Sequence, residues 1–251
     1  MPALLFGRRV ARSRWTLAGL AVVAALALAA ASAPWLAPGD PYHGELAVAL
    51  RAPSTAFPLG TDAQGRDVLS RVLFGARLSL AIGLTSQAIS LATGLFLGLW
   101  AGFRGRWVDA VVMRAADVTL AFPSLLLLIA VAARGQVLVT RGLDYVQAAR
   151  ALGASDVRLV ARHVLPNVLG PVIVAATLGV GGAIMAEAAL SFVGLGAQPP
   201  TPSWGAMIAE GRDLLRVAPW VSLFPGLAIG LAVLGVNLVG DGLRDALDVR
   251  A

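Results

Sequence analysis

The chain has 251 residues, of which 58% are hydrophobic and 14% charged, whereas a soluble domain of this size carries about 25% charged residues. The formal net charge is +6 and every basic residue is an arginine, but long apolar runs separate the arginines and argue against a nucleic-acid-binding protein. Cysteine is absent and the two histidines, His43 and His163, lie far apart, which excludes disulfides and thiolate catalysis and leaves no pattern for a metal site. The composition therefore predicts a membrane protein without a metal centre.

The N-terminal part, residues 1–36, predicts a basic tail followed by a first transmembrane helix. Four arginines and no acid precede the apolar run Trp15–Leu36, which can cross a bilayer because a spanning helix needs about 20 apolar residues. Arginines gather on the cytoplasmic side of spans, so the N-terminus is predicted to be cytoplasmic. Basic residues, an apolar stretch and Ala31-Ser32-Ala33 are also typical of a cleavable signal peptide, but the apolar run is long for one and continues to Leu36, so a retained helix is the better interpretation.

Residues 37–77 predict an extracytoplasmic segment. They contain four arginines and four acids, and such a balanced loop is not retained in the cytoplasm by its charge. The stretch Gly65–Arg77 places apolar residues on one helical face and predicts an interfacial helix, which is also a candidate contact for a binding protein.

Residues 78–251 contain three more apolar runs, Leu78–Gly102, Asn167–Ala189 and Trp220–Val239. The loop 190–219 is balanced in charge and is predicted to lie outside, whereas residues 103–114 and 134–167 carry net charges of +2 and +3 and are predicted to lie inside. The short run Val118–Ala133 between them therefore cannot cross the membrane once. It re-enters, lies flat or lacks a partner helix, and the sequence leaves these alternatives open.

The basic segment 144–166 interrupts the apolar runs and predicts two short helices joined by a turn. Gly153 suits the left-handed conformation that ends a helix, Ser155 is placed to cap the second helix with Asp156 in its first turn, and Pro166 is expected to stop that helix. Periodicity alone fits an interfacial amphipathic helix whose arginines meet lipid phosphates equally well.

This segment resembles the cytoplasmic coupling signature of bacterial ABC importer permeases, which here reads Gln147-Ala148-Ala149, then Gly153, then Leu165-Pro166. The resemblance implies that the segment docks on an ATP-hydrolysing subunit. Gln147 stands where the family usually has Glu, which removes one charge from the expected contact. The implied coupling residues are Gln147, Ala148, Ala149, Gly153, Ala154, Ser155, Asp156, Arg158, Leu165 and Pro166.

Three further stretches, Pro58–Asp67, Leu190–Gly205 and Asn237–Asp245, resemble motifs of the C-type subunit of dipeptide, oligopeptide and nickel permeases. The resemblance covers nearly the whole chain and implies an all-α polytopic membrane protein with the permease fold. Family members have six spans, whereas this chain offers about five apolar segments. Since Ala133 runs directly into Arg134, the expectation is that the family's fourth transmembrane helix is missing.

The resemblance implies a permease subunit that forms half of the translocation pathway of an importer for di- or oligopeptides, or for nickel, in the bacterial inner membrane. Its implied partners are a paralogous permease, two ATPase subunits, an extracytoplasmic binding protein and membrane lipid. The chain lacks the lysine of a phosphate-binding loop, so ATP and Mg²⁺ are expected in the partner subunits and no cofactor in this chain. An intramembrane enzyme is disfavoured because the spans lack paired catalytic groups; a remnant that inserts but does not transport stays open as an alternative.

Four residues are candidates for the pathway or an outer gate: Glu187, Ser191, Pro200 and Trp204. Glu187 is the one acid well inside a strongly apolar run, and such acids are functional candidates, although it could equally bond to the loop 190–205. The proline-rich stretch 199–202 is stiff and could form a gate, or simply pack. Gln87 is expected to bond across helices, as polar residues in membrane helices often do.

Overall fold

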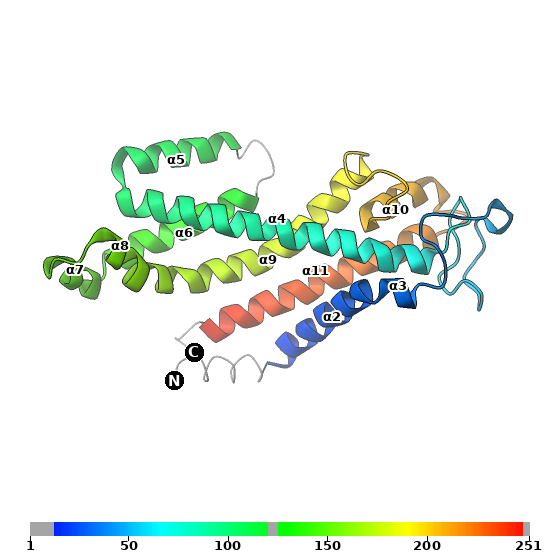
Figure 1. The fold of residues 1–251 in the computed structure, drawn as a ribbon, viewed down its shortest axis with the longest axis horizontal. Coiled ribbons are helices and arrows are strands. Elements are labelled where there is room, and N and C mark those ends of the chain that lie inside the picture. The colour runs from blue at the N-terminus through cyan, green and yellow to red at the C-terminus, as the bar shows by residue number, and fades with distance from the viewer. Residues whose placement is uncertain (1–12, 120–124, 248–251) are drawn as a thin grey trace. The chain divides into compact units, whose positions relative to one another are not determined.

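The computed structural model describes residues 13–119 and 125–247, and within these ranges every regular element is helical (Figure 1). The described helices are α2 (Arg14–Ala31), α3 (Ala33–Leu36), α4 (Val68–Arg104), α5 (Arg106–Thr119), α6 (Leu125–Arg141), α7 (Asp144–Ala151), α8 (Asp156–Leu159), α9 (Leu165–Phe192), α10 (Trp204–Gly211) and α11 (Trp220–Leu247). Two 3₁₀ turns, Leu46–Val48 and Arg212–Leu214, and a π turn, Val160–Val164, complete them. The all-α fold class is confirmed.

Among the described residues, four helical segments are long and apolar enough to cross a membrane: Arg14–Ala31, Val68–Arg104, Asp156–Phe192 and Trp220–Leu247. They coincide with the four long apolar runs in the sequence. Two boundaries differ from expectation. The first run divides at Ser32 into α2 and α3, and Val68–Arg77 forms the first part of the 37-residue helix α4 instead of a separate interfacial helix.

The chain folds as two compact units. The first unit comprises the described parts of Met1–Thr16, Thr85–Gly179 and Gly240–Ala251, and the second comprises Leu17–Leu84 and Val180–Val239. The second unit contains α2, α3, the segment that follows them, and α10. Its core gathers alanines and branched residues around the fully buried Trp204, and Gly19 of α2 packs against the backbone of α11 at Gly235. Small residues permit this close approach between membrane helices.

In the first unit, α4 and α6 pack along a stripe of glycines. A Cβ added at Gly94, Gly98 or Gly102 would lie within 3.0 Å of Ile129, Ala133 or Val137 respectively, so bare backbone is required at each of these positions. The residue numbers of these contact pairs increase in the same direction along both helices, so α4 and α6 are parallel. The spacing of four residues places the three glycines on one face of α4, and the contact is a small-residue helix interface.

The parallel packing of α4 and α6 concerns residues 118–133, which the charge pattern predicts do not cross the membrane once. Helix α5 runs back beside the end of α4, and α6 returns to it (Figure 1), where the Arg141 side chain donates to the Gly102 carbonyl at 2.8 Å. Arg134 pairs with Asp109, with Nη2 and Oδ2 2.6 Å apart, and links the two helices. Both ends of the α5–α6 pair therefore lie at the same end of α4, as the flanking arginines require.

Helix α6 extends beyond Ala133, where the predicted apolar run ends. The helix begins at Leu125 and continues through Ala133 and Arg134 to Arg141. Arg134 does not end it because Asp109 on α5 neutralises the charge. Helices of 14 and 17 residues are about 21 and 26 Å long at 1.5 Å per residue, which is shorter than the hydrocarbon core of about 30 Å. The first residues of the predicted run include 120–124, which lie outside the described part of the chain.

Candidate functional site

The segment 144–166 forms a helix, a turn and a second helix, as its sequence indicates. Helix α7 ends at Ala151, and Gly153 follows with φ of +81°. A Cβ at Gly153 would meet no atom within 4 Å, so it is the backbone conformation, and not lack of space, that favours glycine there. Helix α8 then begins at Asp156.

Side chains at both ends of the segment attach it to the rest of the first unit. The Gln147 amide donates to the Arg141 carbonyl at the end of α6 (2.8 Å), and Asn167 on α9 donates to the Tyr145 hydroxyl (3.1 Å). Val146 and Leu159 are fully buried. A carboxylate has no N–H to donate, so the glutamine that departs from the family pattern makes a bond that glutamate could not make.

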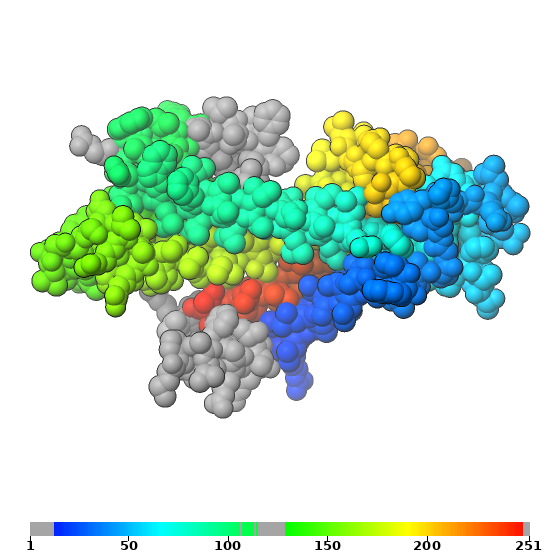
Figure 2. Space-filling model, viewed as in Figure 1, coloured from blue at the N-terminus to red at the C-terminus, as the bar shows by residue number. Residues whose placement is uncertain are grey.

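The turn itself is apolar and exposed. Leu152 exposes 88% of its surface and Val157 exposes 79%, and the α7–α8 segment is uncovered on the face drawn in Figure 2. Of the predicted coupling residues, seven are exposed and three half-buried; the exposed ones are Gln147, Ala148, Gly153, Ser155, Asp156, Arg158 and Pro166, and the half-buried ones are Ala149, Ala154 and Leu165. Anchored helices thus present an apolar turn to a partner or to lipid.

Two local expectations for this segment are wrong. Ser155 occupies the N-cap position of α8 with extended backbone, but its side chain makes no capping hydrogen bond. Pro166 does not stop the helix, because α8 continues through the π turn Val160–Val164 into α9. The Leu165 N–H bonds to the Val160 carbonyl five residues back, and this wider turn carries the helix past a proline that has no N–H to donate.

Three of the four pathway or gate candidates meet in a buried polar network in the second unit. Glu187 accepts hydrogen bonds from Ser191 on its own helix (2.7 Å) and from Ser79 on α4 (3.1 Å). Ser79 also accepts from the backbone N–H of Trp204 (3.3 Å), and Ser203 lies 3.4 Å from Ser191 through their hydroxyls. Glu187 is 6% exposed. Its carboxylate joins α9 to α4, and the two serines that it binds connect this pair to the start of α10.

Trp204, the first residue of α10, and Pro200, in the loop before this helix, occupy different environments. Trp204 is fully buried, and its indole N–H donates to the Val72 carbonyl of α4 at 3.0 Å. Pro200 is exposed, and no described contact brings it into the Glu187 network. The sequence correctly singled out the loop, but the network uses Ser79 and Ser203, which the sequence analysis did not select.

A cluster of four charges in the second unit, three of them buried and Glu210 half-buried, was also missed. Asp62 Oδ2 accepts from Arg66 Nε (2.7 Å) and Arg71 Nη1 (2.5 Å), and Glu210 on α10 accepts from the same two arginines at 2.6 to 3.0 Å. The Asp62, Arg66 and Arg71 side chains are at most 5% exposed. One feature of the sequence pointed to this cluster: the loops 37–77 and 190–219 each contain equal numbers of acids and arginines. Both loops contribute residues to the cluster, which is neutral overall.

Gln87 on α4 departs from the expected bond across helices. The side chain is 4% exposed, and neither its amide nitrogen nor its oxygen has a hydrogen-bond partner among the described residues. A Cβ added at Gly179 on α9 would lie 2.6 Å from the Gln87 Oε1, so the glycine leaves just enough room for the amide. An unpaired amide buried in a membrane helix costs free energy.

Replacing Gln87 with Met is expected to raise the free energy of unfolding by about 1–3 kcal/mol, because an apolar side chain of similar length removes the buried unpaired amide. Unfolding of the purified chain in mixed detergent micelles measures this difference. Gln64→Met is the matched control at an exposed amide and is expected to leave stability within about 0.5 kcal/mol. A less stable Gln87→Met variant would show that the amide is paired in the folded protein.

Two family models and several known transport proteins match this chain. Residues 128–251 match the family model for the binding-protein-dependent transport system inner membrane component, and residues 3–53 match the N-terminal transmembrane domain of oligopeptide transport permease C. The chain is 41% identical to a putative peptide transport system permease protein of Brucella suis and 44% identical to a di/tripeptide transport system permease protein of Pseudomonas aeruginosa, each over 99% of this chain and 92% of the relative. It is 44% identical to a glutathione transport system permease protein of Pectobacterium atrosepticum over 79% of this chain and 74% of the relative.

The lengths of these alignments indicate a deletion. The Brucella alignment runs over 274 residues, whereas this chain has 251, so at least 23 aligned positions lie opposite gaps in this chain. That number corresponds to about one membrane-spanning helix. The size of the gap matches the one helix that the sequence analysis expects to be missing.

Proposed function

The chain belongs to the binding-protein-dependent inner membrane permeases of ABC importers, and on this premise we propose that it is one of two permease subunits that together form the pathway for small peptides. The proposed partners are a paralogous permease, two ATPase subunits that bind ATP and Mg²⁺, and an extracytoplasmic binding protein. The proposed orientation places the N-terminus and residues 144–166 in the cytoplasm. Peptides are preferred as substrate because relatives are named for peptides, di/tripeptides and glutathione.

The observation that carries the proposal is the exposed apolar turn between α7 and α8. Leu152 and Val157 are among the most exposed large apolar side chains of the described chain, at 88% and 79%, although Val146 and Leu159 on either side of them are fully buried. An apolar tip held by buried anchors suits insertion into a groove on another protein. Since α8 continues through the π turn into α9, displacement of the turn would move the start of a spanning helix. This is the proposed route by which ATP-driven movement reaches the pathway.

Replacing Val157 with Asp is expected to weaken binding of the ATPase subunits by about tenfold or more, because the change places a charge in the centre of an apolar contact. Copurification of the ATPase subunits with the tagged chain, titrated by salt and dilution, measures the loss. Val217→Asp is the matched control, since Val217 is 67% exposed in a loop of the second unit. The same pair of variants is then assayed for ATP-dependent uptake of a labelled dipeptide.

The two readouts separate the candidate functions. Loss of both copurification and uptake in Val157→Asp alone supports a working permease coupled through this turn. Copurification with no uptake in the unmodified chain would favour the transport-incompetent remnant, for which the gap of at least 23 positions is the specific observation. Equal copurification of both variants would contradict docking at the turn and leave the segment as a lipid-facing amphipathic helix.

A further inference from the structure

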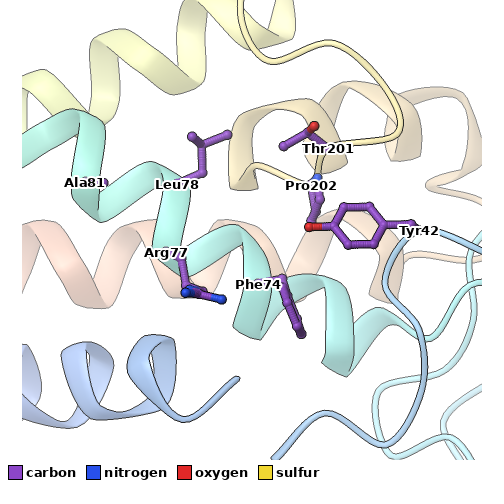
Figure 3. A pocket seen from close by; sticks show the side chains of 7 residues that line it. All are labelled: Tyr42, Phe74, Arg77, Leu78, Ala81, Thr201 and Pro202. Carbon is purple, nitrogen blue, oxygen red and sulfur yellow. The ribbon is translucent and has the colours of Figure 1, made fainter. Parts of the chain in front are cut away.

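A cavity of about 260 Å³ in the second unit lies outside the sites described above (Figure 3). Three stretches distant in sequence line it: the segment after α3, the first turns of α4, and the loop before α10. The lining residues that matter here are Tyr42, Phe74, Arg77, Leu78, Ala81 and Pro202. Figure 3 shows the Tyr42 ring pointing towards Pro202, with Phe74 and Arg77 on neighbouring turns of α4.

Two polar groups of this cavity have no partner among the described residues. Within the described chain, the Tyr42 hydroxyl and the Arg77 guanidinium form no hydrogen bond or ion pair, yet both residues contact the ring of Phe74. Arg77 Cζ lies 5.9 Å from the centre of that ring, and the Tyr42 ring meets it edge-on at 6.1 Å. A cation and a hydroxyl beside one aromatic ring are donors of the kind that an anion accepts from.

The backbone also holds Tyr42 in place. The Tyr42 N–H donates to Asp40 Oδ1 at 2.7 Å, and this bond, together with the His43 side chain, lowers the pKa of the Asp40 carboxyl. Asp40 is therefore ionised at neutral pH and keeps the turn formed. Its carboxylate is paired with His43, with Nδ1 and Oδ2 2.9 Å apart, and not with Arg77.

The position of the cavity along α4 indicates the class of ligand that it suits. Arg77 is the last charged residue before the apolar run that begins at Leu78, and Ala81 lies one turn further into that run. If this run spans the membrane, Arg77 lies at the polar boundary and the wall formed by Leu78 and Ala81 lies on the hydrocarbon side. We propose that this cavity binds one membrane phospholipid, with the phosphate on Arg77 and Tyr42 and an acyl chain along Leu78 and Ala81.

Charge and depth together favour a phospholipid over a soluble anion. The guanidinium fork matches the paired oxygens of a phosphate, and basic sites beside transmembrane helices are suited to lipid headgroups. The carboxylate of a free peptide would satisfy Arg77 equally well, but such a ligand gains nothing from an apolar wall that continues into the hydrocarbon layer. The proposed leaflet is the one reached by the C-terminal end of α2.

The test compares dioleoylphosphatidylglycerol with dioleoylglycerol, which has the same acyl chains and no phosphate. Native mass spectrometry of the full chain in detergent counts the bound lipid. One phosphatidylglycerol is expected to bind more tightly than dioleoylglycerol. Arg77→Gln is expected to weaken that binding by about tenfold, and Tyr42→Phe by about threefold, since a charged partner contributes more than a neutral hydroxyl.

Arg216→Gln is the control, because Arg216 is another exposed arginine without a described ion pair; its phosphatidylglycerol binding is expected to stay unchanged. Melting without lipid checks that each variant folds, and Arg77→Lys, expected to bind with intermediate affinity, replaces Arg77→Gln if the latter does not fold. Equal binding by the unmodified chain and Arg77→Gln would overturn the proposal, as would equal binding of the two lipids. Displacement of the lipid by alanyl-alanine from the unmodified chain, but not from Arg77→Gln, would instead assign the cavity to a soluble carboxylate.

Discussion

Replacing Arg71 with Met is expected to lower the free energy of unfolding by about 3–5 kcal/mol, the cost of removing one partner from a buried ion pair. The Arg71 guanidinium contacts Asp62 at 2.5 Å and Glu210 at 2.6 and 3.0 Å, and its side chain is 1% exposed. Without it, the buried Asp62 carboxylate keeps Arg66 as its one remaining cation. The loss follows because a carboxylate removed from water needs its full set of charged donors.

The matched control for this prediction is Arg212→Met. Arg212 pairs with Asp213 at 3.2 Å, but the two side chains are 59% and 82% exposed, and exposed pairs contribute about 0–1 kcal/mol. Denaturant titration of both variants in mixed detergent micelles gives the comparison. Similar losses in the two variants would contradict the explanation based on burial.

Replacing Trp204 with Ala is expected to cost about 3–5 kcal/mol, the usual range for deleting a large aromatic side chain from a core. Trp204 is fully buried at the centre of the apolar core of the second unit, next to Ile184 and Ile229. The change leaves a cavity and removes the indole bond to the Val72 carbonyl. It also loosens the loop before α10 that the Glu187 network holds, so uptake is expected to fall together with stability.

Trp204→Phe separates packing from hydrogen bonding at the same position. Phenylalanine retains most of the buried ring and loses the N–H, so the expected loss is about 1 kcal/mol, the typical contribution of one hydrogen bond. Thermal unfolding in detergent and dipeptide uptake are measured for both variants. A Phe variant as unstable as the Ala variant would mean that the bond to Val72, and not the packing, holds the loop.

The membrane-spanning helices and the turn at Gly153 could be predicted from the sequence because their causes are local. An apolar run of about 20 residues must be helical in lipid, since every backbone group has to be paired within the segment. A glycine flanked by two amphipathic stretches, Asp144–Ala151 and Asp156–Leu159, indicates the left-handed turn that the structure has at φ +81°. The charge pattern also ruled out a single crossing between residues 114 and 134, before any contact was known.

The places where sequence reasoning failed depend on partners distant along the chain. Glycine spacing on α4 shows a face that allows close packing, but only the fold shows that Ile129, Ala133 and Val137 of α6 fill it. Arg134 continues a helix because Asp109, 25 residues earlier, neutralises it. The helix also continues through Pro166, because the π turn Val160–Val164 shifts the hydrogen-bond register before the proline.

The sequence alone predicts which segments are helical, which are apolar enough to span, and where the turn at Gly153 lies, because backbone pairing in lipid and glycine conformation are properties of short segments. Tertiary structure alone decided the partners of the charged and polar side chains. Asp62 and Glu210 are separated by most of the chain, yet both accept from Arg66 and Arg71. The composition of the loops 37–77 and 190–219 sets their net charge. The burial that makes these ion pairs strong arises only when α4 and α10 pack together.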